Sequence, residues 1–237
     1  MLRILLLFLS LIPLSRLSGQ NFVGAGNLYP LTIDGNKYVV SGFIPFSNLT
    51  DEEIYANALL WTVESICPKG QEGITARDVK AKNFSCDLIL SSLAGSGLEN
   101  IYHCRATFRV KDNKLIYYLS DILIESSAFV LKKMTPMEKL TPKKKSAHQE
   151  TMDDFIQVGS TLLNKLFDFT AINQLPKITH WEEINIRKPV KGMTPTECRL
   201  AFGKPQTILE TNGEIQWMYN SSFYLFFKNG VVQTIIK

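Results

Sequence analysis

The chain has 237 residues, of which 45% are hydrophobic and 20% charged, and its formal net charge is +4. This apolar share is enough to bury a core, and it excludes an intrinsically disordered chain. A net charge this small argues against a protein that binds nucleic acid through its phosphates.

Residues 1–20 have the pattern of a secretory signal. Arg3 provides a basic start, and Ile4–Leu14 form an apolar core that is shorter than the roughly 20 residues needed to span a bilayer as a helix. We expect cleavage after Gln20 and a short leader over residues 21–36. The mature chain is then exported to the periplasm or the extracellular space. The alternative is an uncleaved anchor or a buried N-terminal helix.

The first predicted module, residues 37–170, begins with a strand over residues 37–46, which are dense in β-branched and aromatic side chains. Thr50 and Glu53 then have the spacing of a capping box, and the apolar stripe after them predicts a helix. Three strand-like stretches follow. These stretches are residues 74–91, 101–110 and 115–124. The order of elements is β-α-β-β-β-β if residues 74–91 hold two strands.

Four cysteines occur, none in a CxxC pair, beside three histidines that are far apart, so we expect no metal site and no cofactor. No cysteine precedes Cys67, which argues against lipid attachment at the N-terminus. Cys86 and Cys104 face each other if their hairpin folds about Gly95, and an oxidising compartment would then allow a disulfide. A one-residue slip places them on opposite faces, and the alternative is two small buried thiols.

A lysine-rich stretch at residues 132–145 contains six Lys, one Glu and two Pro, a composition that predicts a linker or loop. Lys143, Lys144 and Lys145 are a candidate patch for an anionic surface such as lipid head groups, and the alternative is a solvated hinge. An amphipathic helix over residues 152–167 is expected next, packed on the sheet.

Residues 171–183 are predicted to link a second module, residues 184–237, which we expect to be separable from the first. Thr194 and Glu197 predict another capping box, and Gly203 is expected to end that helix. Asn-Gly turns then separate strand candidates that form an antiparallel meander. These strand candidates are residues 206–210, 215–219, 223–227 and 231–236.

Residues 192–205, GMTPTECRLAFGKP, are followed by WMY at 217–219 and YLFFKNGVVQTI at 224–235. This pattern resembles the SmpA/OmlA repeat of outer-membrane lipoproteins over about 50 residues. The resemblance implies a helix-on-meander shape and no single function, because that scaffold serves both envelope assembly and enzyme inhibition. The chain departs from the lipoproteins in lacking a lipid-accepting cysteine.

Residues 37–61 read KYVVSGFIPFSNLTDEEIYANALLW. Through this stretch, residues 30–170 resemble an uncharacterised domain of secreted Bacteroidota proteins with a TATA-binding-protein-like fold. That resemblance implies an α+β fold in which helices pack on one side of a curved antiparallel sheet. It implies no activity, and a fold shared with a DNA-binding protein is no evidence of DNA binding.

Common catalytic patterns such as GxSxG, HExxH and the P-loop do not occur in the sequence. His103 adjoins Cys104, but neighbours along a strand point to opposite faces. We therefore expect an exported, non-catalytic module that binds a protein or assists envelope assembly, without nucleic acid, without an evident small-molecule substrate and with at most peripheral membrane contact. The alternatives are a secreted inhibitor that inserts Tyr219 or Phe223 into an enzyme cleft, and an unrecognised hydrolase.

Overall fold

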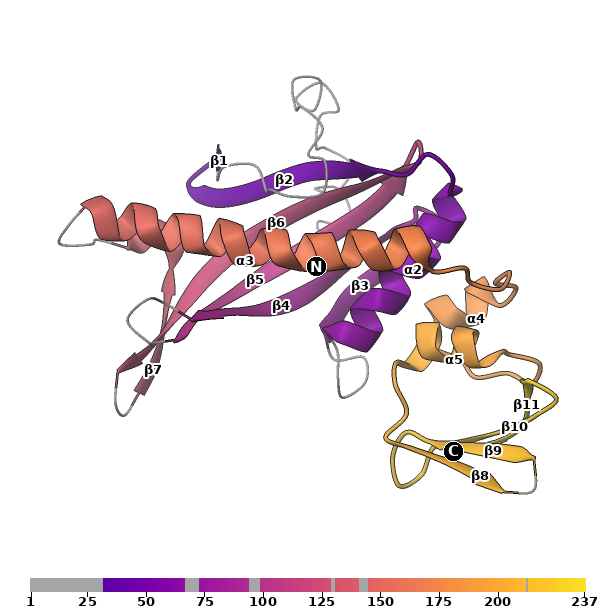
Figure 1. The fold of residues 1–237 in the computed structure, drawn as a ribbon. Coiled ribbons are helices and arrows are strands. Elements are labelled where there is room, and N and C mark those ends of the chain that lie inside the picture. The colour runs from indigo at the N-terminus through magenta and orange to yellow at the C-terminus, as the bar shows by residue number, and fades with distance from the viewer. Residues whose placement is uncertain (1–31, 67–72, 94–98, 129–130, 141–144, 212) are drawn as a thin grey trace.

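Two antiparallel sheets, each with helices on one side, make up the structure (Figure 1). The computed structural model describes residues 32–66, 73–93, 99–128, 131–140, 145–211 and 213–237. The expected signal segment, most of the leader, and Lys143 and Lys144 lie outside the described residues. Nothing is described of the side chain of Lys145.

The larger sheet has seven strands in the order β1-β2-β6-β5-β4-β3, with β7 paired to β6. The expected α+β class is therefore confirmed, and residues 74–91 do contain two strands, separated by a turn in which Lys82 has a φ of 48°. The strands are β1 (Thr32–Asp34), β2 (Lys37–Pro45), β3 (Ile74–Asp78), β4 (Asn83–Leu93), β5 (Glu99–Lys111), β6 (Lys114–Ala128) and β7 (Leu131–Pro136).

The long strand β6 exchanges one neighbour for another along its length. Residues 114–119 pair with β2, whereas residues 123–128 pair with β7. Between the two stretches Asp121 has a φ of 52°, and the register with β5 shifts. This bulge bends β6 so that its two halves carry different edge strands.

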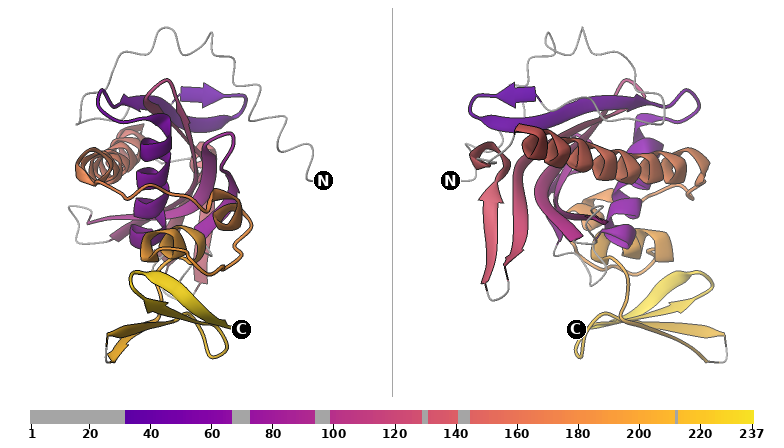
Figure 2. Two further views of the ribbon diagram at one scale, coloured as in Figure 1. Left: turned by 90° about the vertical axis from the view of Figure 1, so that its right-hand side faces the viewer. Right: turned by 60° about the vertical axis from the view of Figure 1, so that its left-hand side comes forward.

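Two helices cover one face of the larger sheet: α2 (Asp51–Ser65) and α3 (Lys145–Ile172) (Figures 1 and 2). The capping box predicted for Thr50 and Glu53 is present at the start of α2. Every residue of α2 from Ile54 to Val63 is buried, because the helix lies between the sheet, α3 and the C-terminal helices.

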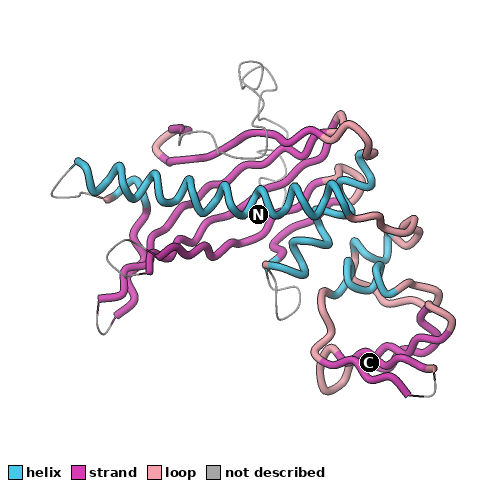
Figure 3. Tube along the Cα trace, viewed as in Figure 1, coloured by secondary structure: helices cyan, strands magenta, loops and turns pink. Residues whose placement is uncertain are grey.

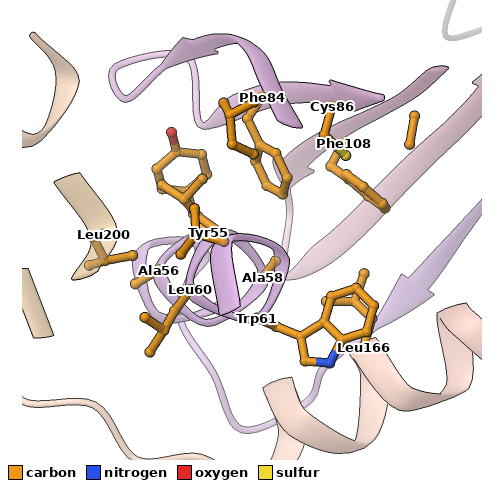
Figure 4. Close-up of a cluster of buried hydrophobic side chains, with 14 of the residues drawn as sticks. Tyr55, Ala56, Ala58, Leu60, Trp61, Phe84, Cys86, Phe108, Leu166 and Leu200 are labelled. Atoms are coloured by element: carbon orange, nitrogen blue, oxygen red, sulfur yellow. The ribbon is translucent and has the colours of Figure 1, made fainter. Parts of the chain in front are cut away.

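The core is one continuous cluster that joins the two predicted modules. Figure 4 shows Tyr55 beside Phe84 of the sheet, and Leu200 of a C-terminal helix beside Ala56 and Leu60 of α2. Burial of these apolar side chains is the main stabilising contribution to such a joint.

The C-terminal part consists of two short helices followed by a four-stranded meander in the order β11-β10-β9-β8 (Figure 3). The capping box of Thr194 and Glu197 is again present, and Gly203 ends the second helix with a φ of 76°. The elements are α4 (Trp181–Asn185), α5 (Pro195–Phe202), β8 (Thr207–Thr211), β9 (Glu214–Met218), β10 (Tyr224–Lys228) and β11 (Val231–Ile236).

The prediction of a loop over the lysine-rich stretch, residues 132–145, is wrong for residues 132–139. Residues 131–136 form β7, and residues 137–139 form a 3-10 helix, η3 (Met137–Lys139), in which Met137 is fully buried. The strand forms because residues 123–128 of β6 offer an edge beyond the end of β2. Tertiary pairing here overrides a composition that is typical of loops.

The segment between the modules is packed against the larger one. The amides of Asn57 and Asn173 form a hydrogen bond of 2.9 Å, and Asn57 also donates to the Asn173 carbonyl at 3.1 Å. Ile178 is buried in the shared core, and Trp181 contacts Tyr55 with ring centroids 5.6 Å apart. Residues 171–183, which are predicted to link the two modules, thus pack against the shared core.

Candidate binding surface

The small C-terminal sheet has one face turned toward α5 and one turned away from it. Trp217, Leu225 and Phe227 lie on the first face and are buried in the core cluster. Arg199 of α5 lies over the Trp217 ring, 5.4 Å from its centroid. This inner face is therefore occupied by the helix that precedes the meander.

We call the opposite side the outer face and define it by strand register. Its first row is Thr207, Met218, Tyr224 and Ile236, and its second row is Leu209, Gln216, Phe226 and Thr234. Among the described residues no helix or strand lies over this face (Figures 1 and 2). A sheet face this rich in large apolar side chains ordinarily packs against something.

Exposure on the outer face is greatest at its two edges. Leu209 on β8 is 54% exposed and Ile236 on β11 is 48% exposed, while the aromatic rings between them are half-buried. At one end Lys228 and Glu214 form an exposed ion pair of 3.6 Å. An apolar centre with a charged rim is the usual anatomy of a protein-protein interface.

Tyr219 and Phe223, the residues expected to contact a partner, instead pack within the module. Their rings stack with centroids 5.0 Å apart, and both meet Phe202 of α5 edge-on, at 5.7 Å and 5.2 Å. The Tyr219 hydroxyl is buried. Because these rings hold α5 on the sheet, the structure gives no support to their use as anchors in an enzyme cleft.

The outer face is not among the features predicted from the sequence, although β10 carries a signal for it. A strand with one solvated face alternates apolar and polar residues. The run from Tyr224 to Phe227 is apolar at every position, which requires apolar side chains on both faces of the strand. Two packed faces could therefore have been expected from that run.

The uncovered face of the larger sheet is more polar. Arg105 and Asp87 form an exposed ion pair of 3.2 Å across β5 and β4, and the hydroxyls of Ser85 and Thr107 lie 3.0 Å apart. These groups satisfy one another across neighbouring strands. Such a face is compatible with solvent and presents a weaker case for docking.

His103 is also on this face, and its Nε2 lies 2.9 Å from Glu125 Oε2. Cys104, its neighbour along β5, points into the core, as expected for adjacent residues of a strand. Burial, with a smaller contribution from Asp87, raises the pKa of the Cys104 thiol to about 12. The thiol is therefore protonated at neutral pH, which argues against a role as a nucleophile.

The predicted pairing of Cys86 with Cys104 does not occur. The hairpin register places Cys86 opposite Ala106 and Cys104 opposite Leu88, two residues away from direct apposition. Both cysteines are on the buried face, as thiols. The alternative of two small buried thiols is the one that the structure shows.

An aspartate on α3 ties that helix to the ends of two strands. Asp154 Oδ2 accepts hydrogen bonds from the hydroxyls of Ser92 and Tyr102, and from the Asn100 amide at 3.0 Å. Burial raises the pKa of Asp154, but these donors outweigh it and the net pKa is lowered. We interpret the cluster as a support for α3, because every group in it satisfies another.

Glu197 is a buried hub at the base of the C-terminal module and has no exposed surface. Beyond its capping box with Thr194, it accepts hydrogen bonds from the backbone N–H groups of Thr179 and His180, at 2.7 Å and 3.1 Å. His180 Nδ1 lies 3.0 Å from its Oε2. Burial raises the pKa of Glu197, but these hydrogen bonds outweigh it and hold the pKa at about 2.

The described residues contain neither a metal-binding cluster nor a helix that could span a membrane. No cluster of three or more His, Cys, Asp or Glu side chains is placed to hold a metal ion. Among the same residues no helix is both long enough and apolar enough to span a membrane.

Neither a protein-family model nor a curated protein sequence matches the chain. A solved TBP-like protein from Parabacteroides distasonis is similar in structure: the TM-score is 0.51 at 13% identity, over 61% of this chain and 99% of that one. A DUF4468 family protein from Bacteroides ovatus covers 65% of this chain and 96% of itself, at 14% identity and a TM-score of 0.46. The first likeness supports the expected TBP-like fold and, at this identity, shows the fold alone.

Proposed function

We propose that this protein is an exported, non-catalytic module that binds another protein through the outer face of its C-terminal sheet. One observation carries the proposal. Five large apolar side chains share a face over which no described element lies: Leu209, Met218, Tyr224, Phe226 and Ile236. Aromatic residues and methionine, three of these five, are enriched in the cores of protein interfaces.

The rest of the molecule is consistent with a scaffold that presents this face. The inner face of the same sheet is fixed to α5, and α5 is fixed to α2 by the ion pair of Arg199 and Glu64 at 2.8 Å. A binding surface on such a rigid base loses little conformational freedom when a partner docks. We propose export from the pattern of the N-terminal segment, and a role in envelope assembly from the resemblance of the C-terminal module.

The test compares partner recovery by three versions of the chain from the envelope fraction of the native host. The outer-face variant carries Leu209→Ser and Phe226→Ser. The control carries Ile89→Ser, which removes an isoleucine that is 69% exposed on the larger sheet. A partner that the wild type and the control retain and the outer-face variant loses supports the proposal. Equal recovery by all three versions contradicts it.

Export has its own measurement, the intact mass of the protein from the native host. A mass that begins at Asn21 is expected. A full-length mass in the membrane pellet would show that the N-terminal segment is an anchor.

A further inference from the structure

The edge strands of the two sheets differ in how they are protected against pairing with another chain. Natural edge strands are kept from such pairing by shortness, lysines, other charges or bulges. In the larger sheet, β1 has three residues and β7 contains two lysines. Strand β3 has a register shift between Ile74 and Ala76, and it carries two charged residues, Arg77 and Asp78. In the small sheet, β11 has a bulge opposite Phe226 and Phe227.

The remaining edge strand, β8, has the least of this protection. It contains no lysine or arginine, and its register with β9 runs without a shift from Thr207 to Thr211. Its one charged residue is Glu210. Within the described part of the chain β9 is the only strand that pairs with it, so its other edge offers backbone donors and acceptors.

Both sides of β8 are apolar at this edge. Ile208 and Leu209 are adjacent, so they point to opposite faces of the sheet, and they are 49% and 54% exposed. Packing on the outer face alone would cover Leu209 and leave Ile208 in water. A strand added beside β8 would cover both side chains, because its own side chains alternate between the same two faces.

We propose that the partner binds by adding an extended segment to the β8 edge, with apolar side chains beside Ile208 and Leu209 and a lysine or arginine beside Glu210. This inference rests on the proposed function and names how the partner is held. Cross-strand pairing of opposite charges favours a cation next to Glu210, and like charges directly opposite each other are unfavourable.

A second copy of the chain meets these requirements less well. Antiparallel pairing of two β8 strands centred on Glu210 would oppose two carboxylates. Centring the pair on Leu209 would place each Glu210 beside an isoleucine, and β8 has no cation to offer. The chemistry of the edge therefore favours an unlike segment of another protein.

The test selects ten-residue peptides from a random display library on the full chain and measures the affinity of the enriched peptides for single variants. We expect two adjacent apolar residues next to a lysine or arginine. Ile208→Lys and Leu209→Lys should each weaken binding by about tenfold or more, because a lysine on an edge strand obstructs the added strand. Glu210→Lys should shift the enriched peptides from basic to acidic.

Ile89→Lys is the matched control, because Ile89 is an exposed isoleucine of the larger sheet and belongs to neither proposed surface. Strand addition predicts loss of binding in the Ile208 variant and no change in the Ile89 variant. Docking on the outer face alone predicts that Ile208→Lys retains binding, because Ile208 points to the opposite face, and that Ile236→Lys loses it; this result would overturn strand addition and leave the proposed function standing. Strand addition is overturned if no peptide is enriched. It is also overturned if the enriched peptides bind all of these variants with the same affinity as the wild type. In either case the partner-recovery experiment decides the proposed function by itself. A concentration-dependent dimer that Ile208→Lys abolishes would overturn the unlike partner in favour of self-pairing.

Discussion

Arg77 on β3 donates a hydrogen bond from Nη1 to the carbonyl oxygen of Leu200 in α5, over 2.8 Å. The same guanidinium reaches the carbonyls of Ile184 at 3.2 Å and Ala201 at 3.4 Å. One side chain of the larger sheet thus satisfies carbonyl groups at the ends of both C-terminal helices. Burial, followed by the charge of Arg187, lowers the pKa of Arg77 to about 10, so it stays charged at neutral pH.

Replacement of this side chain should loosen the C-terminal helices. We expect Arg77→Met to lower the free energy of unfolding by about 3 kcal/mol, because a charged donor is lost and buried carbonyls are left without it. Denaturant unfolding measures the loss. Hydrogen exchange should show that it is concentrated in α4 and α5.

Arg105→Met provides the comparison, because the ion pair of Arg105 with Asp87 is exposed. Its removal should cost less than about 0.5 kcal/mol. A loss of similar size in both variants would mean that Arg77 does not hold the two parts of the molecule together.

Glu197 should make the stability of the protein depend on acid pH. Its pKa is about 2 when folded, against an ordinary value of 4.5. The stability it contributes is therefore fully present above pH values near 4.5 and is lost as the pH falls from there toward 2. We expect Glu197→Gln to cost about 2 kcal/mol at pH 7, with the difference from wild type shrinking over that range.

Glu53→Gln is the matched variant for this prediction, because Glu53 closes the same kind of capping box at an exposed helix start. Its cost at pH 7 should be about 0.5 kcal/mol, as for a cap in water. Unfolding free energies measured from pH 2 to pH 7 test both variants. Equal costs, or a Glu197→Gln cost that does not change with pH, would contradict the role of Glu197 as a buried hub.

Local signals in the sequence were reliable where a few neighbouring residues determine the structure. Both capping boxes form as predicted, and Asn229 and Gly230 both adopt positive φ in the turn between β10 and β11. In each case the hydrogen bonds or dihedral angles involve residues within three positions of one another. No distant contact is needed to specify them.

Features that depend on distant partners were not predictable. In the register of β4 with β5, Cys86 lies opposite Ala106 and Cys104 lies opposite Leu88, so the two cysteines are two positions from direct apposition. The role of Arg77 depends on carbonyl groups more than a hundred residues away. A pattern along the chain cannot show which strand edge is open or which helix end will meet a given side chain.

The buried cysteines should resist alkylation while the protein is folded. Burial raises the pKa of both Cys104 and Cys198 to about 12, with smaller contributions from Asp87 and Glu197. We expect iodoacetamide at pH 8 to leave both thiols unmodified in the native protein and to modify both in denaturant, as read by peptide mass. A crosslinked peptide joining Cys86 to Cys104 in the native protein would instead show that the disulfide forms.

The last prediction concerns Tyr219, whose ring packs against Phe202 and Phe223. Its buried hydroxyl has no hydrogen-bond partner within the described structure. A buried donor without a partner is costly, so Tyr219→Phe should raise the free energy of unfolding by about 1 kcal/mol. Tyr219→Ala should lower it by about 3 kcal/mol, because the ring between β9 and α5 is lost.

Denaturant unfolding of this pair of variants also decides between the two roles considered for the residue. If Tyr219 were an anchor for an enzyme cleft, its truncation would abolish inhibition and leave the fold intact. The packing seen here predicts instead that Tyr219→Ala loses stability. It also predicts that Tyr219→Phe folds as the wild type does and is more stable. If Tyr219→Ala were as stable as the wild type, the result would instead support Tyr219 as an anchor that contacts an enzyme cleft.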